Sequence, residues 1–387
     1  MIESECFAMY KVKTMNKISK IGLAELDDRF EIADTMENEE AILVRSAKLH
    51  DYDFPASLQC IARAGAGVNN IPLDRAADAG IVVFNTPGAN ANGVKELAIC
   101  ALLLASRKVS QGIAWVQEQS AAGADVAAVV EKGKSAYVGP EIMGKTLGVV
   151  GLGAIGVLVA NAAAALGMKI VGYDPFLSVK NALNLTPGAK VVSTMGELFA
   201  EADYVTLHLP MMDSTKGTIN ADAFAAMKDG VRIINLARGG LVDTAALKDA
   251  MASGKCAAYV TDFPDSDTAA IEGVVAIPHL GASTPESEDN CAVMASRQVK
   301  DYLDNGNIVN SVNLPVLSMA WAASKRVCVI TKGADAAAVM AAVPGVVASA
   351  SNTRGDYGYF LLDTDGAVDE AAVKAVPGVL RVRVLSK

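Results

Sequence analysis

The chain has 387 residues, of which 52% are hydrophobic and 20% charged, a composition that suits two or three domains with buried cores and excludes a mainly disordered protein. The longest apolar run of note, Leu97–Ala105, is far shorter than the about 20 residues of a membrane-spanning helix, and the first residues lack the apolar region of a secretory signal. The net charge of −9 argues against a nucleic acid as the main partner.

The cysteines and histidines predict neither a disulfide framework nor a metal site. Six cysteines are scattered at positions 6, 60, 100, 256, 291 and 328 without a C-x-x-C pair, and the three histidines show no spacing typical of zinc ligands. We therefore expect a cytoplasmic protein with reduced thiols, no bound metal and no membrane partner.

The first hundred residues predict a small α/β domain. Its expected strands and the turns after them are Ala41–Arg45, Gln59–Arg63 with Ala64–Gly67, and Ile81–Phe84 with Thr86–Gly88. The nearly all-apolar stretch Leu97–Arg107 then predicts a long helix buried between domains.

From about residue 147, short apolar runs alternate with helical patterns. The expected strands are Leu147–Val150, Met168–Tyr173, Tyr204–Leu209, Val231–Leu236, Ala257–Thr261 and Val274–Ile277. The expected helices between them include Ile155–Leu166, Ala221–Met227 and Thr244–Ala252. Such alternation predicts a doubly wound α/β domain with a parallel sheet buried on both faces.

The last third of the chain predicts a helix, a linker and a small domain. The helix runs from about Glu286 to Leu303, and residues 308–323 lack periodicity and contain a proline. Beyond them, residues 335–346 and 369–379 are similar, and each copy is a helical pattern that ends at Pro-Gly before a strand-like run. With the runs 326–331 and 357–363, the order is βαββαβ, a ferredoxin-like arrangement. Chance similarity in an Ala/Val-rich sequence is the alternative.

The strongest motif is the G-x-G-x-x-G formed by Gly151, Gly153 and Gly156, which follows a predicted strand and opens a predicted helix. In that context Gly151 permits a tight turn, Gly153 lets the backbone approach a pyrophosphate, and Gly156 lets helix and strand pack closely. Asp174 ends the next predicted strand, where a carboxylate accepts the ribose hydroxyls and repels a 2′-phosphate. The pattern therefore predicts NAD rather than NADP as cofactor; an ordinary helix-capping role for Asp174 is the alternative.

Two later segments place reactive side chains at strand ends. Arg238 lies in Asn235-Leu-Ala-Arg-Gly-Gly, and His279 lies in Pro278-His-Leu-Gly-Ala-Ser-Thr. Reduction of a carbonyl by hydride needs a proton donor, which an imidazole can be, and a cation that holds a neighbouring carboxylate, which a guanidinium can be. Taken singly, Arg238 could be a surface arginine in a turn and His279 a core histidine; together, downstream of a dinucleotide motif, they predict a catalytic pair.

In this order, the glycine motif, Asp174 and the Arg238 and His279 segments resemble the D-isomer-specific 2-hydroxyacid dehydrogenase family over about residues 41–314. They are most similar to the branch that oxidises 3-phospho-D-glycerate to 3-phosphohydroxypyruvate with NAD in serine biosynthesis. The resemblance implies a flavodoxin-like substrate domain split between residues 1–95 and 287–314, a Rossmann domain at 96–286, a linker at 315–324 and a separate domain at 325–387. It also implies a homo-oligomer.

The resemblance assigns roles to individual residues. It implies that Arg238 binds the substrate carboxylate and carbonyl and that His279 is the general acid/base. The remaining positions that it places along the NAD pocket are Thr86, Ala154, Ile155, His208, Leu209 and Asp262. Those that it places along the substrate cleft are Arg45, Ser46, Gly65, Ala66, Gly67 and Asn90. Arg45 is expected to bind the substrate phosphate, with a solvated arginine at a strand end as the alternative.

The chain departs from the family at one point. The family has a glutamate behind the histidine, in a stretch resembling D-V-F-x-x-E-P, whereas this chain has Asp-Phe-Pro-Asp-Ser-Asp at residues 262–267. We expect Asp265 or Asp267 to supply the carboxylate beside His279, although a shorter side chain must come closer.

Two other functions stay open. One is a reductase of hydroxypyruvate, glyoxylate or another unphosphorylated 2-keto acid, and the other is an NAD-sensing binding protein of the same fold. The retention of both Arg238 and His279 favours an enzyme. Residues 325–387 resemble an ACT domain, a small regulatory module, which implies an amino-acid effector.

Overall fold

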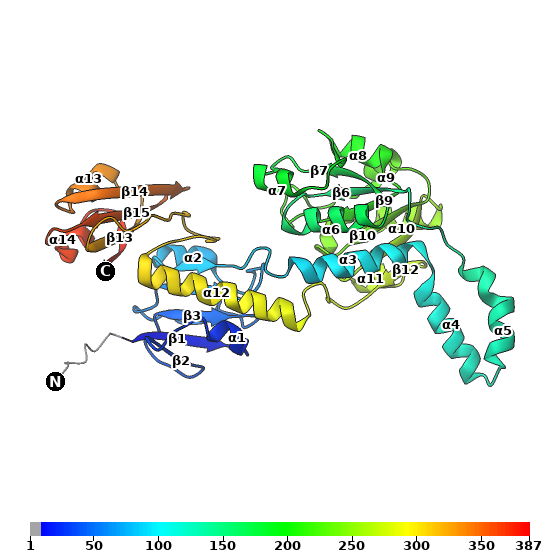
Figure 1. The fold of residues 1–387 in the computed structure, drawn as a ribbon, viewed down its shortest axis with the longest axis horizontal. Helices are drawn as coiled ribbons and strands as arrows, with labels where there is room; N and C mark the ends of the chain where they lie inside the picture. Colours follow the sequence, from blue (N-terminus) through cyan, green and yellow to red (C-terminus); the bar gives the residue numbers. More distant parts are fainter. Residues whose placement is uncertain (1–8) are drawn as a thin grey trace. The chain divides into compact units, whose positions relative to one another are not determined.

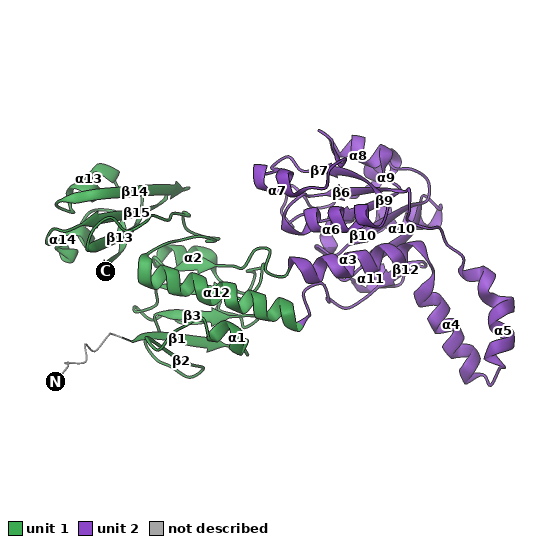
Figure 2. Cartoon of the chain, in the orientation of Figure 1, with its two compact units in different colours: residues 1–90, 285–387 green, residues 91–284 purple. Residues whose placement is uncertain are grey.

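The computed structural model describes residues 9–387. The chain divides into unit 1, residues 1–90 and 285–387, and unit 2, residues 91–284 (Figure 2). Cys6 and the first eight residues of the expected substrate domain lie outside the described residues.

Unit 1 contains a parallel sheet with the strand order β2-β1-β3-β4-β5, which is the order of flavodoxin-like sheets. Figure 1 labels β1, β2 and β3 of this sheet. Its strands are β1 (Tyr10–Met15), β2 (Phe30–Ala33), β3 (Ala41–Val44), β4 (Cys60–Arg63) and β5 (Val82–Phe84). Its helices are α1 (Lys20–Leu23), α2 (Leu73–Asp78) and α12 (Pro285–Asn305). Strands β3, β4 and β5 confirm three predicted strands, whereas β1 and β2 were not predicted because charged residues interrupt their apolar pattern.

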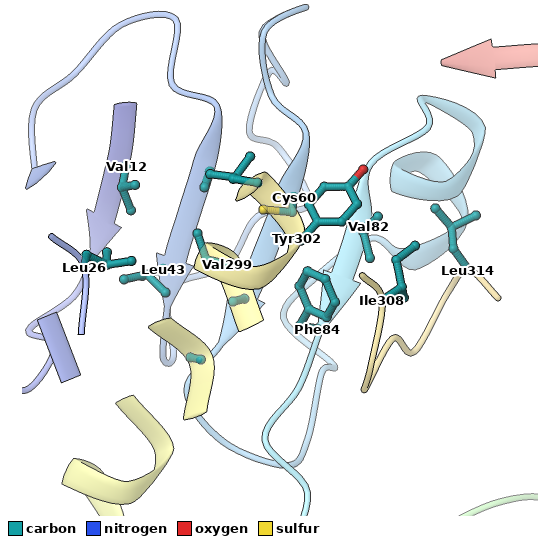
Figure 3. Close-up of a cluster of buried hydrophobic side chains, with 14 of the residues drawn as sticks. Val12, Leu26, Leu43, Cys60, Val82, Phe84, Val299, Tyr302, Ile308 and Leu314 are labelled. Atoms are coloured by element: carbon teal, nitrogen blue, oxygen red, sulfur yellow. The ribbon is translucent and has the colours of Figure 1, made fainter. Parts of the chain in front are cut away.

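Helix α12 returns the chain to unit 1 after unit 2. Its residues Val299 and Tyr302 are fully buried in a cluster with Leu43, Cys60 and Phe84 of the sheet (Figure 3). The rings of Phe84 and Tyr302 meet edge to face at 5.8 Å. The apolar face of α12 therefore closes the core over strands β3, β4 and β5.

The C-terminal part of unit 1 has the predicted βαββαβ order. Its elements are β13 (Lys325–Lys332), α13 (Ala336–Ala341), β14 (Val346–Arg354), β15 (Tyr357–Thr364), α14 (Glu370–Lys374) and β16 (Val379–Ser386). The strands form an antiparallel sheet of order β14-β15-β13-β16. Cys328 and Tyr359 on one face of this sheet belong to the same buried cluster as Tyr302. Val329 and Leu362 on the other face pack with the α13 and α14 side chains.

Unit 2 contains a parallel sheet of order β12-β11-β10-β9-β6-β7-β8. Its strands are β6 (Thr146–Val150), β7 (Lys169–Tyr173), β8 (Lys190–Val191), β9 (Tyr204–Leu207), β10 (Val231–Asn235), β11 (Cys256–Thr261) and β12 (Val274–Ala276). Consecutive residues of one strand pack on opposite faces of the sheet. Val149 and Ile234 belong to one buried cluster, and Val150 and Ile233 belong to another. The predicted doubly wound Rossmann-like sheet, buried on both faces, is confirmed.

The helices of unit 2 cover both faces of the sheet and extend beyond it. They are α3 (Ala91–Ser106), α4 (Val109–Ala121), α5 (Val126–Gly133), η1 (Lys134–Tyr137), α6 (Ala154–Ala165), α7 (Val179–Asn184), α8 (Met195–Glu201), α9 (Ala221–Ala226), η2 (Gly239–Leu241), α10 (Thr244–Ala252) and α11 (Ser266–Ala269). Helix α3 begins six residues before the predicted Leu97, and α4 and α5 were not predicted. In residues 9–387, no single helix is long and apolar enough to cross a membrane; α3 and α4, bent by 68°, meet the length and composition requirement only as a pair.

Candidate active site

The glycine loop after β6 has the geometry that its three glycines predict. Gly151 has φ +95°, and a Cβ there would lie 2.6 Å from the His208 carbonyl oxygen. A Cβ on Gly156 would lie 1.9 Å from the Gly151 carbonyl oxygen, so this glycine lets α6 pack against the loop. A Cβ on Gly153 would meet no described atom within 4 Å. Packing within the protein therefore explains why residues 151 and 156 are glycines. It does not explain Gly153, beside which there is space for a ligand.

Asp174, directly after β7, is bonded to the glycine loop. One carboxylate oxygen accepts the Leu152 amide at 2.9 Å, and the other accepts the Phe176 amide at 2.8 Å. Each oxygen retains a second lone pair, so the carboxylate can still accept hydroxyl donors. Helix α6, which begins with Ala154 and Ile155, presents its first amides beside this carboxylate, and among the described residues no side chain caps it.

His208 and Leu209 follow β9, the neighbour of β6 in the sheet. The His208 amide donates to the Val150 carbonyl at 2.8 Å, and a ring nitrogen of His208 lies 3.0 Å from the hydroxyl of the fully buried Thr206. Desolvation of this partly buried ring lowers the pKa of His208 to about 4. His208 is therefore neutral at physiological pH, and its ring adds no positive charge beside the glycine loop.

Arg238 lies on a turn that a buried asparagine holds together. The Asn235 amide nitrogen donates to the Arg238 carbonyl at 2.9 Å and to the Tyr259 hydroxyl at 3.1 Å. The Asn235 side-chain oxygen accepts the backbone amides of Ala237 and Arg238 at 3.2 and 3.4 Å. Asn235 is fully buried at the end of β10, so the side chain that fixes the turn is itself fixed. Sequence reasoning did not identify Asn235.

His279 and Arg238 both contact the ring of Phe263. The His279 imidazole and the Phe263 ring have centroids 4.2 Å apart at an interplanar angle of 46°, and the Arg238 guanidinium carbon lies 5.2 Å from the Phe263 centroid. The three residues follow β10, β11 and β12, which are adjacent in the sheet. Two predicted site residues, 41 positions apart in the chain, thus meet on one aromatic ring that sequence reasoning did not identify.

Asp262 is the carboxylate that lies behind this group. One oxygen accepts the Gly281 amide at 3.0 Å, and the other is buried without a hydrogen-bond partner among the described residues. Burial raises the pKa of the Asp262 carboxyl, whereas the Gly281 amide and the His279 ring act in the opposite direction.

Asp265 and Asp267 are occupied elsewhere in the described structure. The Asp265 carboxylate caps α11 by accepting the Thr268 amide at 2.7 Å, and this bond holds its pKa below the usual range. Asp267, in the first turn of α11, lines a hollow with Lys248 and Glu272. Among the described residues, neither carboxylate forms a hydrogen bond or ion pair with the His279 ring.

The predicted substrate residues lie in unit 1, at the ends of β3 and β4. The Arg45 guanidinium pairs with Glu288 at 2.6 Å, and both side chains are about two-fifths exposed (40% and 45%). The exposed Ser46 donates its amide to the Asn16 side chain at 2.9 Å. Arg63, which sequence reasoning did not single out, donates to the Arg45 carbonyl at 3.1 Å.

The glycine turn of unit 1 lies against Arg63. A Cβ on Gly65 would come within 1.6 Å of an Arg63 guanidinium nitrogen, and the carbonyl of Ala66 accepts the Asn85 side chain at 2.8 Å. Gly67 completes the turn. The amide of the fully buried Thr86 donates to the Gly65 carbonyl at 3.1 Å, and Asn90 is the last residue of unit 1 before α3.

Comparison with known proteins identifies the family. Residues 99–281 match the family described as D-isomer specific 2-hydroxyacid dehydrogenase, NAD binding domain. This match places residues 99–281 of the chain in the D-isomer specific 2-hydroxyacid dehydrogenase family. It is 35% identical over 329 residues to a D-3-phosphoglycerate dehydrogenase of Bacillus subtilis, covering 80% of this chain and 60% of that relative. The chain therefore spans less than two thirds of the length of that relative.

Two solved structures share the fold of most of the chain. The NAD⁺-bound 3-phosphoglycerate dehydrogenase of Entamoeba histolytica aligns with a TM-score of 0.61 at 27% identity, covering 80% of this chain and 100% of that one. A glyoxylate reductase from Paecilomyes thermophila aligns with a TM-score of 0.64 at 28% identity, covering 79% and 98%.

The residues of unit 2 fit the NAD that the family binds. The space beside Gly153 admits a phosphate, and the uncapped amides of α6 and the Asp174 oxygens can hold a pyrophosphate and a ribose. The unpartnered Asp262 oxygen is a buried acceptor that an amide donor would satisfy. These groups lie at the carboxyl ends of strands in one sheet, the edge at which open α/β sheets bind ligands.

Proposed function

We propose that this protein oxidises 3-phospho-D-glycerate to 3-phosphohydroxypyruvate with NAD, the entry step of phosphorylated serine biosynthesis. The observation that carries the proposal is the contact of Arg238 and His279 with one ring, at the same sheet edge as the glycine loop. The Bacillus subtilis relative, named D-3-phosphoglycerate dehydrogenase, supports this choice of substrate.

The proposed reaction divides between two side chains. Arg238 binds the substrate carboxylate with its guanidinium and polarises the adjacent C2 oxygen. His279 removes the proton from the C2 hydroxyl during oxidation and returns it to the carbonyl in the reverse direction. NAD, when bound, supplies the hydride acceptor. The half-buried Arg238 is fixed by Asn235, whereas the exposed His279 can exchange its proton with solvent.

Selection of a phosphorylated acid is assigned to unit 1. Arg45, already paired with the Glu288 carboxylate, can bind an anion, and a phosphate would take the place of that carboxylate. The amides of Gly65, Ala66 and Gly67 are proposed to line the substrate cleft with Ser46 and Asn90, and Thr86 to contact NAD.

The decisive experiment measures NADH absorbance with purified protein and 3-phosphohydroxypyruvate. We expect NADH to be consumed, and we expect His279→Gln to lower kcat by about 10²–10⁴-fold while NADH still binds with unchanged fluorescence response. Arg238→Gln should mainly raise KM for the keto acid. Unchanged turnover in His279→Gln would refute the role of His279.

A reductase of unphosphorylated keto acids is the second candidate, because a glyoxylate reductase is among the aligned structures. A panel of glyoxylate, hydroxypyruvate and 3-phosphohydroxypyruvate at fixed NADH separates the two candidates. Preference for glyoxylate would overturn the phosphorylated substrate, and NADH binding without turnover of any acid would indicate an NAD-sensing protein.

The C-terminal sheet is proposed to be an ACT-like regulatory domain at residues 325–387, after a linker at 315–324. Its βαββαβ order and its strand order support this assignment. If the activity stays the same in millimolar serine, serine is not the amino-acid effector of this domain.

We further propose that the substrate domain comprises residues 1–95 and 287–314 and that the NAD domain comprises residues 96–286. We also propose that the enzyme is a cytoplasmic homo-oligomer.

A further inference from the structure

Phe263 is held firmly at the point where Arg238 and His279 meet. It lies two residues beyond the end of β11, and its amide donates to the hydroxyl of the fully buried Thr261 at 3.1 Å. A Cβ on Gly239 would lie 3.1 Å from the Phe263 carbonyl oxygen and 3.6 Å from its Cβ, so the arginine turn packs directly on this residue. The ring is half-buried and is followed by a proline, which restricts the backbone of Phe263.

The ring offers both functional side chains a favourable surface. The face of an aromatic ring carries partial negative charge, which attracts a guanidinium within about 6 Å of the centroid. The Arg238 guanidinium carbon, at 5.2 Å, meets this condition. The imidazole of His279, at 4.2 Å and tilted by 46°, packs against the same ring, and an imidazolium there would gain the same attraction.

Among the described residues, no carboxylate holds the His279 ring by a hydrogen bond or an ion pair. Asp265 caps α11 and Asp267 lies in the hollow with Lys248 and Glu272, so neither forms a hydrogen bond or ion pair with His279. Asp262 acts on His279 through its charge, and among the described residues it forms no hydrogen bond or ion pair with the ring; one of its oxygens accepts the Gly281 amide. The direct contact that remains for the imidazole is the ring of Phe263.

We propose that Phe263 is a positioning residue of the proposed dehydrogenase site: its ring holds the Arg238 guanidinium and the His279 imidazole at a fixed spacing, in place of the glutamate that the family pattern puts behind the histidine. The proposal rests on the proposed function for the reaction that it serves. It extends that function because it assigns the orientation of the acid/base to an aromatic contact rather than to an ion pair.

The kinetic test compares Phe263→Leu, which removes the ring, with Phe263→Tyr, which keeps it. Phe54→Leu is the matched control, because the Phe54 ring also lies against a guanidinium, that of Arg75 at 4.4 Å, outside the site. We expect Phe263→Leu to lower kcat/KM by about tenfold to a hundredfold, through both a lower kcat and a higher KM, because the ring contacts both the acid/base and the substrate cation. Phe263→Tyr should stay within about threefold of the wild type and Phe54→Leu within about twofold.

This split distinguishes positioning from general damage. A variant that is merely partly unfolded would lose kcat in proportion to the inactive fraction and keep its KM. NADH affinity, measured by fluorescence titration, should be the same in all four proteins. Wild-type kinetics in Phe263→Leu, or an equal loss in Phe263→Tyr, would overturn the proposal.

A spectroscopic test does not depend on turnover. The chain has three histidines, so the His279 ring signals can be assigned in an NMR spectrum with His279→Gln. The ring current of Phe263 should shift these signals, and Phe263→Leu should remove the shift while those of His50 and His208 stay in place. Unchanged His279 signals in Phe263→Leu would refute the contact. A wild type that reduces no keto acid would instead refute the proposed function and leave this contact intact.

Discussion

The substitution Gly153→Ala separates ligand binding from folding at the glycine loop. Gly153 has φ −74° and ψ −162°, a conformation that alanine adopts, and a Cβ there meets no described atom within 4 Å. Replacing a glycine at a compatible position stabilises a protein by about 0.4–1 kcal/mol, because the unfolded chain loses freedom. Gly153 is also the N-cap of α6, where alanine is less favourable than glycine by a similar amount, so the two effects offset each other. For a domain the size of unit 2, we therefore expect a Tm within about 3 °C of the wild type.

The same methyl group would occupy the space proposed for the cofactor phosphates. We therefore expect Gly153→Ala to weaken NADH binding by about tenfold or more, a loss of at least about 1.4 kcal/mol. Thermal unfolding measures the stability, and quenching of protein fluorescence by NADH measures the affinity. Gly156→Ala is the matched control: its Cβ would lie 1.9 Å from the Gly151 carbonyl oxygen, so it should unfold at a lower temperature.

Two results would refute this reasoning. If Gly153→Ala bound NADH as tightly as the wild type, the space beside residue 153 would not hold the phosphates. If Gly153→Ala unfolded more than about 3 °C below the wild type, residue 153 would have a packing role that the geometry does not reveal.

Three further predictions concern charged groups. Glu288→Gln should lower KM for 3-phosphohydroxypyruvate severalfold at low salt by releasing Arg45, and KM for glyoxylate should stay constant; a change in both would contradict the phosphate role. Because the folded-state pKa of His208 is about 4, against about 6.5 unfolded, the unfolded chain binds more protons in this window. The free energy of unfolding should therefore fall as the pH drops from 6.5 to 4. The part of this fall that comes from His208 should be absent when His208→Gln is denatured over the same pH range. Arg326→Met leaves the fully buried Asp363 without its cation and should cost about 3–5 kcal/mol in chemical denaturation. Arg326→Met with Asp363→Leu should recover part of this loss but not all of it, because three backbone carbonyls lose the Arg326 donor in both variants; no recovery would contradict the ion-pair explanation.

The sequence predicted the parts of the fold that carry strong periodic signals. Six of the seven strands of unit 2 were located to within two residues, because strands buried on both faces form continuous apolar runs. Strand β8, whose two residues Lys190 and Val191 are exposed, was not predicted. Strand β1 was missed, since lysines alternate with its apolar residues, and α4 and α5 were missed although they are regular helices, none of whose residues is buried. Local sequence signals report burial, and these elements bury little.

The site residues show the same division. Gly151, Gly156 and Asp174 follow from local rules, because their roles depend on the backbone within one strand–turn–helix segment. Phe263 could not be found in this way, since Arg238 and His279 follow the neighbouring strands and their meeting on one ring is a property of the sheet. Asn235 was missed for another reason: its bonds to Ala237 and Arg238 are a local asparagine turn that was not recognised, and only its bond to Tyr259 depends on the sheet.

Strand order gives a physical reason why a residue after β11 has to lie between the two functional side chains. Arg238 follows β10 and His279 follows β12, and these strands flank β11. Neighbouring strands are about 4.8 Å apart, so the ends of β10 and β12 are separated by about 10 Å. A guanidinium and an imidazole across such a gap need a filler that is wide, rigid and compatible with positive charge. A phenylalanine ring satisfies all three conditions, whereas the leucine of Phe263→Leu fills the gap but offers no charged group an attractive face.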